Sequence, residues 1–263
     1  MTISKKGFLM SKAFLSLIIS LVILGACGCE PAPEPDFVIG TRPLIKVKPV
    51  KTYTAGHSVE GRPIECSVLG GGEDIVMLIA TIHGNESAGT PIARRMIQFI
   101  RDSDDMLAQH KIVIMPMVNP DGFYHNKRYN ANDVDLNRNF VAFNRVNNKR
   151  NGPHGLSEPE SRVIQETILK YKPNRIIVFH EPLACIDYDG PGGDIAKAMG
   201  KHTDLPVKKL GSRPGSLGSY AGETLGIPII CVELTPKAKK LSADQLWAKY
   251  SKMTMAAIRY NAK

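Results

Sequence analysis

Residues 75–86, IVMLIATIHGNE, join a continuous apolar run directly to a histidine and a glutamate. The run is rich in β-branched residues and does not alternate with polar ones, which predicts a β-strand buried on both faces. Residues 112–115, 176–179 and 229–232 repeat the pattern. Four such strands predict the centre of one largely parallel sheet.

Helical patterns lie between or after these strands. One follows Pro91, a second opens with residues 157–160, SEPE, and a third opens at Ser242 with Gln245 three residues on. We interpret SEPE as a capping box with proline in the first turn. Residues 64–68 alternate apolar and polar side chains, as in an outer antiparallel strand. The prediction is an α/β fold: one domain with a mixed, largely parallel sheet flanked by helices.

The composition is that of a globular protein. The chain has 263 residues, of which 43% are hydrophobic and 22% charged. These values exclude a disordered tail, a collagen-like repeat and a coiled coil. The formal charge of +9 includes three lysines in residues 1–12. Because this segment is expected to be removed, the mature charge is milder, and we expect no nucleic-acid partner.

The N-terminus has the features of an export signal. Residues 1–12 are basic, residues 13–25 are apolar or weakly polar, and small residues precede Cys27. Residues 24–27, LGAC, resemble the bacterial lipobox, whose cysteine is acylated. Cys29 is a second candidate for lipidation, and an uncleaved membrane anchor is the alternative.

The predicted organisation has three parts. Residues 1–26 are a lipoprotein signal peptide, residues 27–45 a Pro-rich tether, and residues 46–263 the catalytic domain. This predicts an exported protein, lipid-anchored to a bacterial membrane on its periplasmic or cell-surface side. The few cysteines do not form a disulfide scaffold or a zinc-thiolate spacing.

Polar residues follow each of the four buried strands. His83 and Glu86 come after the first, residues 119–122 (NPDG) after the second, His180 after the third, and Glu233 ends the fourth. In an open α/β sheet, ligands bind at the carboxyl edge of the strands. We therefore expect these four groups to converge on one site.

His83, Glu86 and His180 are the predicted metal ligands. The i, i+3 spacing of His83 and Glu86 lets both reach one ion from a tight turn. Two histidines and one glutamate are an established ligand set for catalytic zinc, which keeps a fourth position open. The remaining histidines lack this strand-end context and are interpreted as structural: His57, His110, His125, His154 and His202.

Residues 128–140, RYNANDVDLNRNF, are dense in arginine and asparagine and show no apolar periodicity. Such a loop suits recognition of a carboxylate or of developing negative charge. A solvated surface loop is the alternative.

Taken together these motifs resemble the zinc carboxypeptidases of the M14 type. The resemblance spans nearly all of residues 46–263, in the family's order, and includes the entry segment 56–64. It implies that His83, Glu86 and His180 bind one zinc ion.

The resemblance also implies the roles of the other site residues. Glu233 would be the general base that deprotonates the attacking water and passes the proton to the leaving amine. Arg128 would stabilise the tetrahedral oxyanion. Asn137 and Arg138 would hold a substrate carboxylate, and Asp135 would orient His83.

Some features depart from the digestive members of the family. Residues 203–219 contain no tyrosine where an active-site tyrosine is usual, and Tyr220 is the nearest. Glu181 takes the place of the serine that usually follows the third zinc ligand. Residues 180–190 and 214–219 instead resemble the murein peptide amidase subgroup. That likeness implies cleavage of the γ-D-glutamyl–meso-diaminopimelate bond in cell-wall peptides.

Other functions stay open from the sequence. They are a zinc carboxypeptidase acting on other peptides, a deacylase of small N-acyl amino acids, and a non-catalytic wall-binding lipoprotein. The sequence does not fix the oligomeric state or the peptide length. Nor does it decide whether Asp187, Tyr188 or Asp189 contacts the diaminopimelate.

Overall fold

The computed structural model describes residues 50–261. The predicted signal peptide, the tether and the lipidation candidates Cys27 and Cys29 lie outside this range. Within it, no helix is both long enough and apolar enough to span a membrane.

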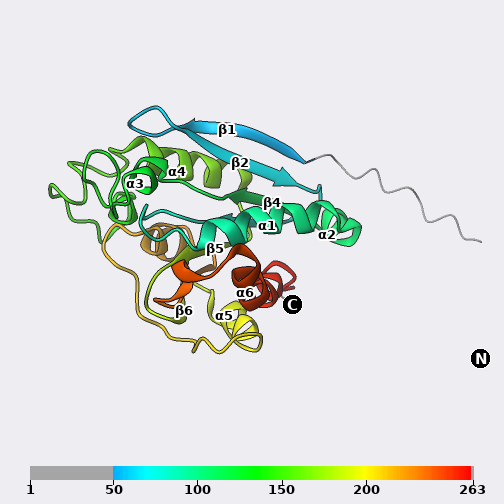
Figure 1. Cartoon of the computed structure of the whole chain (residues 1–263). Coiled ribbons are helices and arrows are strands. Elements are labelled where there is room, and N and C mark those ends of the chain that lie inside the picture. Colours follow the sequence, from blue (N-terminus) through cyan, green and yellow to red (C-terminus); the bar gives the residue numbers. More distant parts are fainter. Residues whose placement is uncertain (1–49, 262–263) are drawn as a thin grey trace, which may run out of the picture. The chain divides into compact units, whose positions relative to one another are not determined.

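A single seven-stranded mixed sheet forms the centre of the domain (Figure 1). Its order is β1-β2-β4-β3-β5-β7-β6, and the four central strands β4, β3, β5 and β7 run parallel. The outer strands β1, β2 and β6 pair antiparallel with their neighbours. The strands are β1 (Lys51–His57), β2 (Pro63–Leu69), β3 (Asp74–Ile79), β4 (His110–Met115), β5 (Arg175–His180), β6 (Cys185–Asp189) and β7 (Ile229–Glu233).

Helices and loops cover both faces of the sheet. The elements are α1 (Gly89–Arg101), α2 (Asp104–Gln109), α3 (Pro120–Tyr124), α4 (Pro159–Tyr171), α5 (Gly193–Gly200), α6 (Ala243–Ile258), the short turns η1 (Leu136–Arg138) and η3 (Ala238–Lys240), and the π-helix η2 (Gly218–Thr224). Because strand side chains alternate, Val76 and Leu78 of β3 join the core beneath α1, α5 and α6. Met77 and Ile79 join the opposite core with α4 and η2. Burial on both faces explains the continuous apolar strands.

The predicted strands and helices are confirmed, with one local correction. Ser242 and Gln245 form the expected capping box at the start of α6. The box at SEPE is wrong: Glu158, not Ser157, is the N-cap of α4, and it makes no side-chain cap bond. The Ser157 hydroxyl instead donates to the Glu158 carboxylate at 2.7 Å.

Several elements, among them β1, β6 and α5, carry no sequence signal that we recognised. Strand β1 is largely exposed at the edge of the sheet, so its residues show no buried face to mark it. Strand β6, at the other edge, places acidic residues at buried positions, and α5 has only eight residues. In these elements tertiary contacts outweigh local preference.

Candidate functional site

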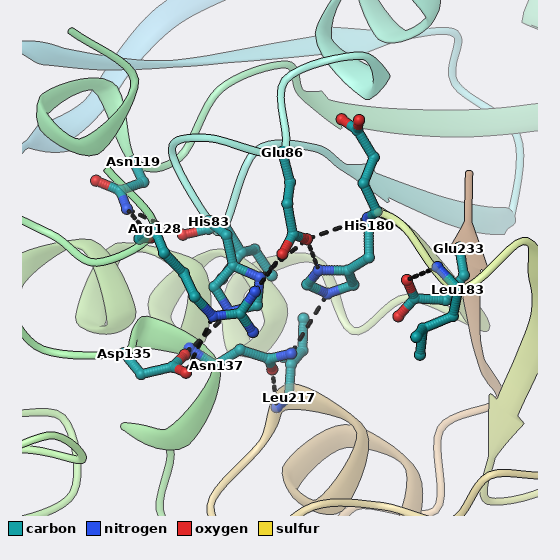
Figure 2. Close-up of polar contacts among 12 residues, drawn as sticks. His83, Glu86, Asn119, Arg128, Asp135, Asn137, His180, Leu183, Leu217 and Glu233 are labelled. Carbon is teal, nitrogen blue, oxygen red and sulfur yellow. Dashed lines mark hydrogen bonds and ion pairs between the residues drawn. The ribbon is translucent and has the colours of Figure 1, made fainter. Parts of the chain in front are cut away.

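The predicted site residues gather at the carboxyl edge of the parallel strands (Figure 2). His83 and Glu86 lie in the loop between β3 and α1, and His180 is the last residue of β5. Glu233 is the last residue of β7 and pairs with His180 in the sheet register. The fold therefore brings together groups that are far apart in the sequence, as the strand-end pattern predicts.

The side chains of His83, Glu86 and His180 form a compact, buried ligand set. One nitrogen or oxygen atom from each lies within 4.8 Å of the others. The Nδ1 atom of His83 is buried and has no hydrogen-bond partner, although Glu86 Oε2 lies 3.0 Å away. An imidazole nitrogen left free beside a carboxylate and a second imidazole is what a metal ion requires, so these residues fit one zinc ion.

Asp135 fixes the orientation of His83. Its Oδ1 atom lies 3.0 Å from His83 Nε2 and also accepts the backbone N–H of Asn137 at 3.0 Å. Because a carboxylate can only accept, Nε2 carries the proton and Nδ1 presents its lone pair to the site. Burial opposes ionisation of Asp135, but the bond to His83 outweighs it and lowers its pKa to about 2.

Glu86 is held as an anion at the centre of the site. Its Oε2 atom lies 3.0 Å from His180 Nδ1, and Arg128 donates to Oε1. Burial would raise the pKa of Glu86, but the contacts with His180 and His83 outweigh it and keep the pKa well below its usual range. Burial likewise lowers the pKa of His83, and bonds to Asp135 and Glu86 reverse that effect and raise it.

The NPDG motif, residues 119–122, does not line the pocket but contacts the loop that carries His83. The Asn119 side chain accepts the Gly122 N–H at 2.9 Å and donates to the Ile82 carbonyl at 3.1 Å, next to His83. A Cβ atom at Gly84 would lie 2.0 Å from the Gly122 backbone, so this close approach requires glycine. Residues 119–122, one of the four strand-end groups expected at the site, therefore hold the His83 loop in place.

The loop of residues 128–140 both lines the pocket and enters the core. The buried Asn130 side chain donates to Glu158 at 2.7 Å and to Glu160 at 3.0 Å, which ties the loop to the start of α4. Leu136 and Phe140 are fully buried, so the segment contributes to the core although its sequence shows no apolar periodicity. Leu136 lies in the three-residue η1 and Phe140 follows it, a stretch too short for an apolar periodicity to be visible.

The pocket that His83, Glu86 and His180 help to line has a volume of about 250 Å³. Arg128, Asn137 and Arg138 line it, as expected for a carboxylate-binding loop, and so does Glu233. The Asn137 amide lies 3.3 Å from His180 Nε2 and accepts the Leu217 N–H at 2.9 Å. Arg138 donates to the Asn137 carbonyl.

Glu233 lies on the other side of the candidate metal ligands from Arg128 (Figure 2). It is half-buried at the end of β7, and its Oε2 atom lies 3.4 Å from the Leu183 N–H, which donates to it. A carboxylate that opens to the pocket next to a metal site can take a proton from water. Arg128 and Arg138 line the same pocket and add positive charge that suits an anionic substrate.

Sequence reasoning did not assign four further groups that line the pocket. Glu181 is buried and accepts the Ala88 N–H at 2.9 Å, which joins the third ligand's strand to the start of α1. Asp187, Asp189 and Arg213 lie further along the pocket. The alternation of Asp187 and Asp189 before Gly190 is a sequence signal for one shared face. Only the sheet register shows that this face lines the site.

The tyrosine expected in digestive relatives has no counterpart among the pocket residues in the described part of the chain. Tyr220 is buried and stacks on Phe140, with ring centroids 5.8 Å apart. The histidines interpreted as structural also lie outside this pocket.

Comparisons with known proteins agree with this geometry. The family model described as zinc carboxypeptidase matches residues 47–186. Murein peptide amidase A of Escherichia coli K12 is 29% identical over 234 residues, covering 82% of this chain and 92% of that protein.

Solved structures show the same fold. The murein-tripeptide amidase of Escherichia coli O157 aligns with a TM-score of 0.63 at 26% identity, covering 81% of this chain and 93% of that one. Carboxypeptidase A of Helicoverpa armigera aligns with a TM-score of 0.65 at 20% identity, over 80% of this chain and 68% of that one. The chain belongs to the zinc carboxypeptidase family and is a zinc metallopeptidase.

Proposed function

We propose that this metallopeptidase is an amidase that hydrolyses the γ-D-glutamyl–meso-diaminopimelate bond of cell-wall peptides. The observation that carries the proposal is the composition of the pocket. It joins the predicted metal ligands and Glu233 to a carboxylate-binding pair, Asn137 and Arg138, and continues to buried acids. Diaminopimelate carries both carboxylates and a distal ammonium, so it matches such a pocket. Similarity to murein peptide amidases over most of both chains supports the same substrate.

In this proposal His83, Glu86 and His180 hold the zinc ion. When bound, zinc polarises the scissile carbonyl and makes water a stronger acid. Glu233 takes the proton from the attacking water and delivers it to the departing amino group of diaminopimelate. Asp135 keeps His83 in the tautomer that can bind the ion.

The arginines of the 128–140 loop act on the substrate. Arg128 is 37% exposed and reaches the pocket beside Glu86, where it stabilises the oxyanion that develops on the γ-carbonyl oxygen. Asn137 and Arg138 bind the carboxylate next to the scissile amide. A planar guanidinium can hold that carboxylate through two parallel hydrogen bonds.

The test is incubation of the zinc-loaded protein with the tripeptide L-Ala-γ-D-Glu-meso-diaminopimelate, followed by mass spectrometry of the products. We expect free diaminopimelate and the dipeptide L-Ala-D-Glu. The His83→Ala variant is the control, and it should lose zinc and activity while keeping its fold, because a catalytic metal site contributes less to folding than a closed structural one.

Two matched substrates separate this function from the alternatives. An α-linked peptide with a free C-terminus should be cleaved far more slowly; equal rates would favour a general carboxypeptidase. A small N-acyl amino acid should also be poor, and rapid turnover of it would favour a deacylase. A protein that binds zinc but cleaves none of these would contradict the enzymatic proposal.

We also propose that the mature protein is lipid-anchored through Cys27. The lipobox-like residues 24–27 support this, and the anchor would hold the enzyme near its cell-wall substrate. We expect the native protein to partition into detergent, and Cys27→Ser to release it or leave the signal uncleaved. A mature N-terminus mapped upstream of Cys27 would contradict the anchor.

A further inference from the structure

Two buried acids lie on β6 along the pocket, away from the metal ligands. In the register of β6 and β7, Glu233 pairs with Cys185, Cys231 with Asp187, and Ile229 with Asp189. Residues two apart on a strand point to the same face. Asp187 and Asp189 therefore follow Glu233 down one wall of the pocket, and both line it.

The two acids differ in their hydrogen bonds. Asp187 accepts the Leu210 N–H at 2.8 Å. Asp189 is only 3% exposed, yet its Oδ1 atom is buried with no hydrogen-bond partner. No ion pair found within residues 50–261 involves either acid. A buried carboxylate without a partner is costly and calls for a cation.

The surroundings of Asp189 leave its charge uncompensated. Burial is the main cause that raises its pKa to about 6, and Asp187 and Glu223 add repulsion. Lys209 acts in the opposite direction without reversing the shift. Near neutral pH Asp189 is thus ionised in most molecules, although its buried position disfavours the charge.

The backbone of η2 is shaped around this carboxylate. A Cβ atom at Gly218 would lie 2.0 Å from Asp189 Oδ2, and one at Gly222 would lie 2.8 Å from Asp189 Cβ. Glycine at both positions therefore lets the helix enclose the acid. The neighbouring Cys231 thiol, whose pKa burial raises well above its usual value, stays neutral and does not compete for a cation.

We propose that Asp189 binds the distal ammonium group of the substrate and so selects a side chain that ends in a primary amine. Asp187, held by the backbone of Leu210, adds negative charge. Asp189 lies four residues along β6 from Cys185, the partner of Glu233, so the two positions are about 13 Å apart at the usual rise per residue. The Glu233 and Asp189 side chains shorten this backbone separation, so the two nitrogens of an extended seven-carbon diamino acid can each reach one of them.

The inference takes the identity of the ligand from the proposed function but can be tested separately. Binding is measured by calorimetry in the zinc-loaded Glu233→Gln background, where turnover is slowed. One ligand is the tripeptide with meso-diaminopimelate. The other has 2-aminopimelate in its place, which replaces only the distal ammonium by hydrogen.

We expect the diaminopimelate peptide to bind roughly 10–100-fold more tightly than its analogue, as for a charge-assisted hydrogen bond. Adding Asp189→Asn should remove most of this preference, chiefly by weakening binding of the diaminopimelate peptide. Asp187→Asn is the matched control and should reduce the preference less. Equal binding of the two peptides would overturn the inference, as would a preference that survives Asp189→Asn.

A parallel product assay with the wild-type protein separates the two proposals. Hydrolysis of both peptides with equal binding would retain the amidase and reject the ammonium site. An Asp189-dependent preference without hydrolysis would retain the ammonium site and reject the amidase. Because the first comparison uses two ligands on one protein, it does not depend on folding of the Asp189 variant.

Discussion

The pocket contains two buried acids whose surroundings are opposite. Glu86, one of the candidate metal ligands, contacts His83, His180 and Arg128, and its contacts with the two histidines lower its pKa despite burial. Asp189, on β6, has no such partner, and burial raises its pKa to about 6. The charge of Glu86 is compensated by neighbouring side chains, whereas the charge of Asp189 can be compensated by a bound ligand. Hydrolysis belongs to the first region and selection of the substrate to the second.

The largest effect on activity is expected from substitution of Glu233, which lines the pocket near Glu86. Glu233→Gln keeps the shape of the side chain but cannot take a proton. It should lower kcat by roughly 10²–10⁴-fold, the usual contribution of general acid–base catalysis. Steady-state kinetics and metal analysis measure this, and zinc content should stay at the wild-type level. A variant with near wild-type kcat would show that another group is the base.

A smaller effect is expected from Arg138, which lines the same pocket as both acids. Arg138→Lys keeps the charge but loses the planar fork, and the carboxylate it binds is present in both ground and transition states. KM should therefore rise by about 10-fold while kcat changes little. A substrate amidated at that carboxylate provides the control, because it has already lost the partner. Equal losses on the free and amidated substrates would reject the carboxylate-binding role.

The smallest effect is on the stability of the folded protein, and it tests the environment of Asp189 without substrate. Because its folded pKa, about 6, exceeds its ordinary value of 3.8, Asp189 costs stability as pH rises from about 4 to 6. Asp189→Asn removes this cost, so its melting temperature relative to wild type should rise by a few degrees over that interval and then level off.

Thermal melts between pH 4 and 8 measure that difference. Asp194→Asn, at a side chain 75% exposed on α5, is the control and should show no comparable trend. If the Asp189→Asn difference does not change with pH, Asp189 has a compensating partner in the folded protein, and the contrast with Glu86 fails.

The central sheet could be predicted because its strands carry their burial in their sequence. Residues 75–80 are apolar without interruption since both faces meet a core layer. The edge strands could not, because β1 is largely solvated and β6 buries Asp187 and Asp189. An edge strand that lines a pocket carries polar residues at buried positions, so its sequence does not show the apolar pattern of a core strand.

The grouping of the candidate metal ligands could be predicted because each follows a strand whose position was already clear. His83 and Glu86 share a turn, and His180 ends a neighbouring parallel strand. The contacts of Asp189 could not be predicted in the same way. They depend on the close approach of Gly218 and Gly222, which are distant in the sequence and meet β6 only in the fold.

The most direct test of the central claim identifies the bond that is broken. The zinc-loaded wild-type protein is incubated with L-Ala-γ-D-Glu-meso-diaminopimelate in water labelled with heavy oxygen, and the products are weighed by mass spectrometry. We predict one labelled oxygen in the γ-carboxylate of L-Ala-D-Glu and unlabelled diaminopimelate, because water attacks the γ-carbonyl. Release of alanine, or an intact tripeptide in the presence of bound zinc, would contradict the account.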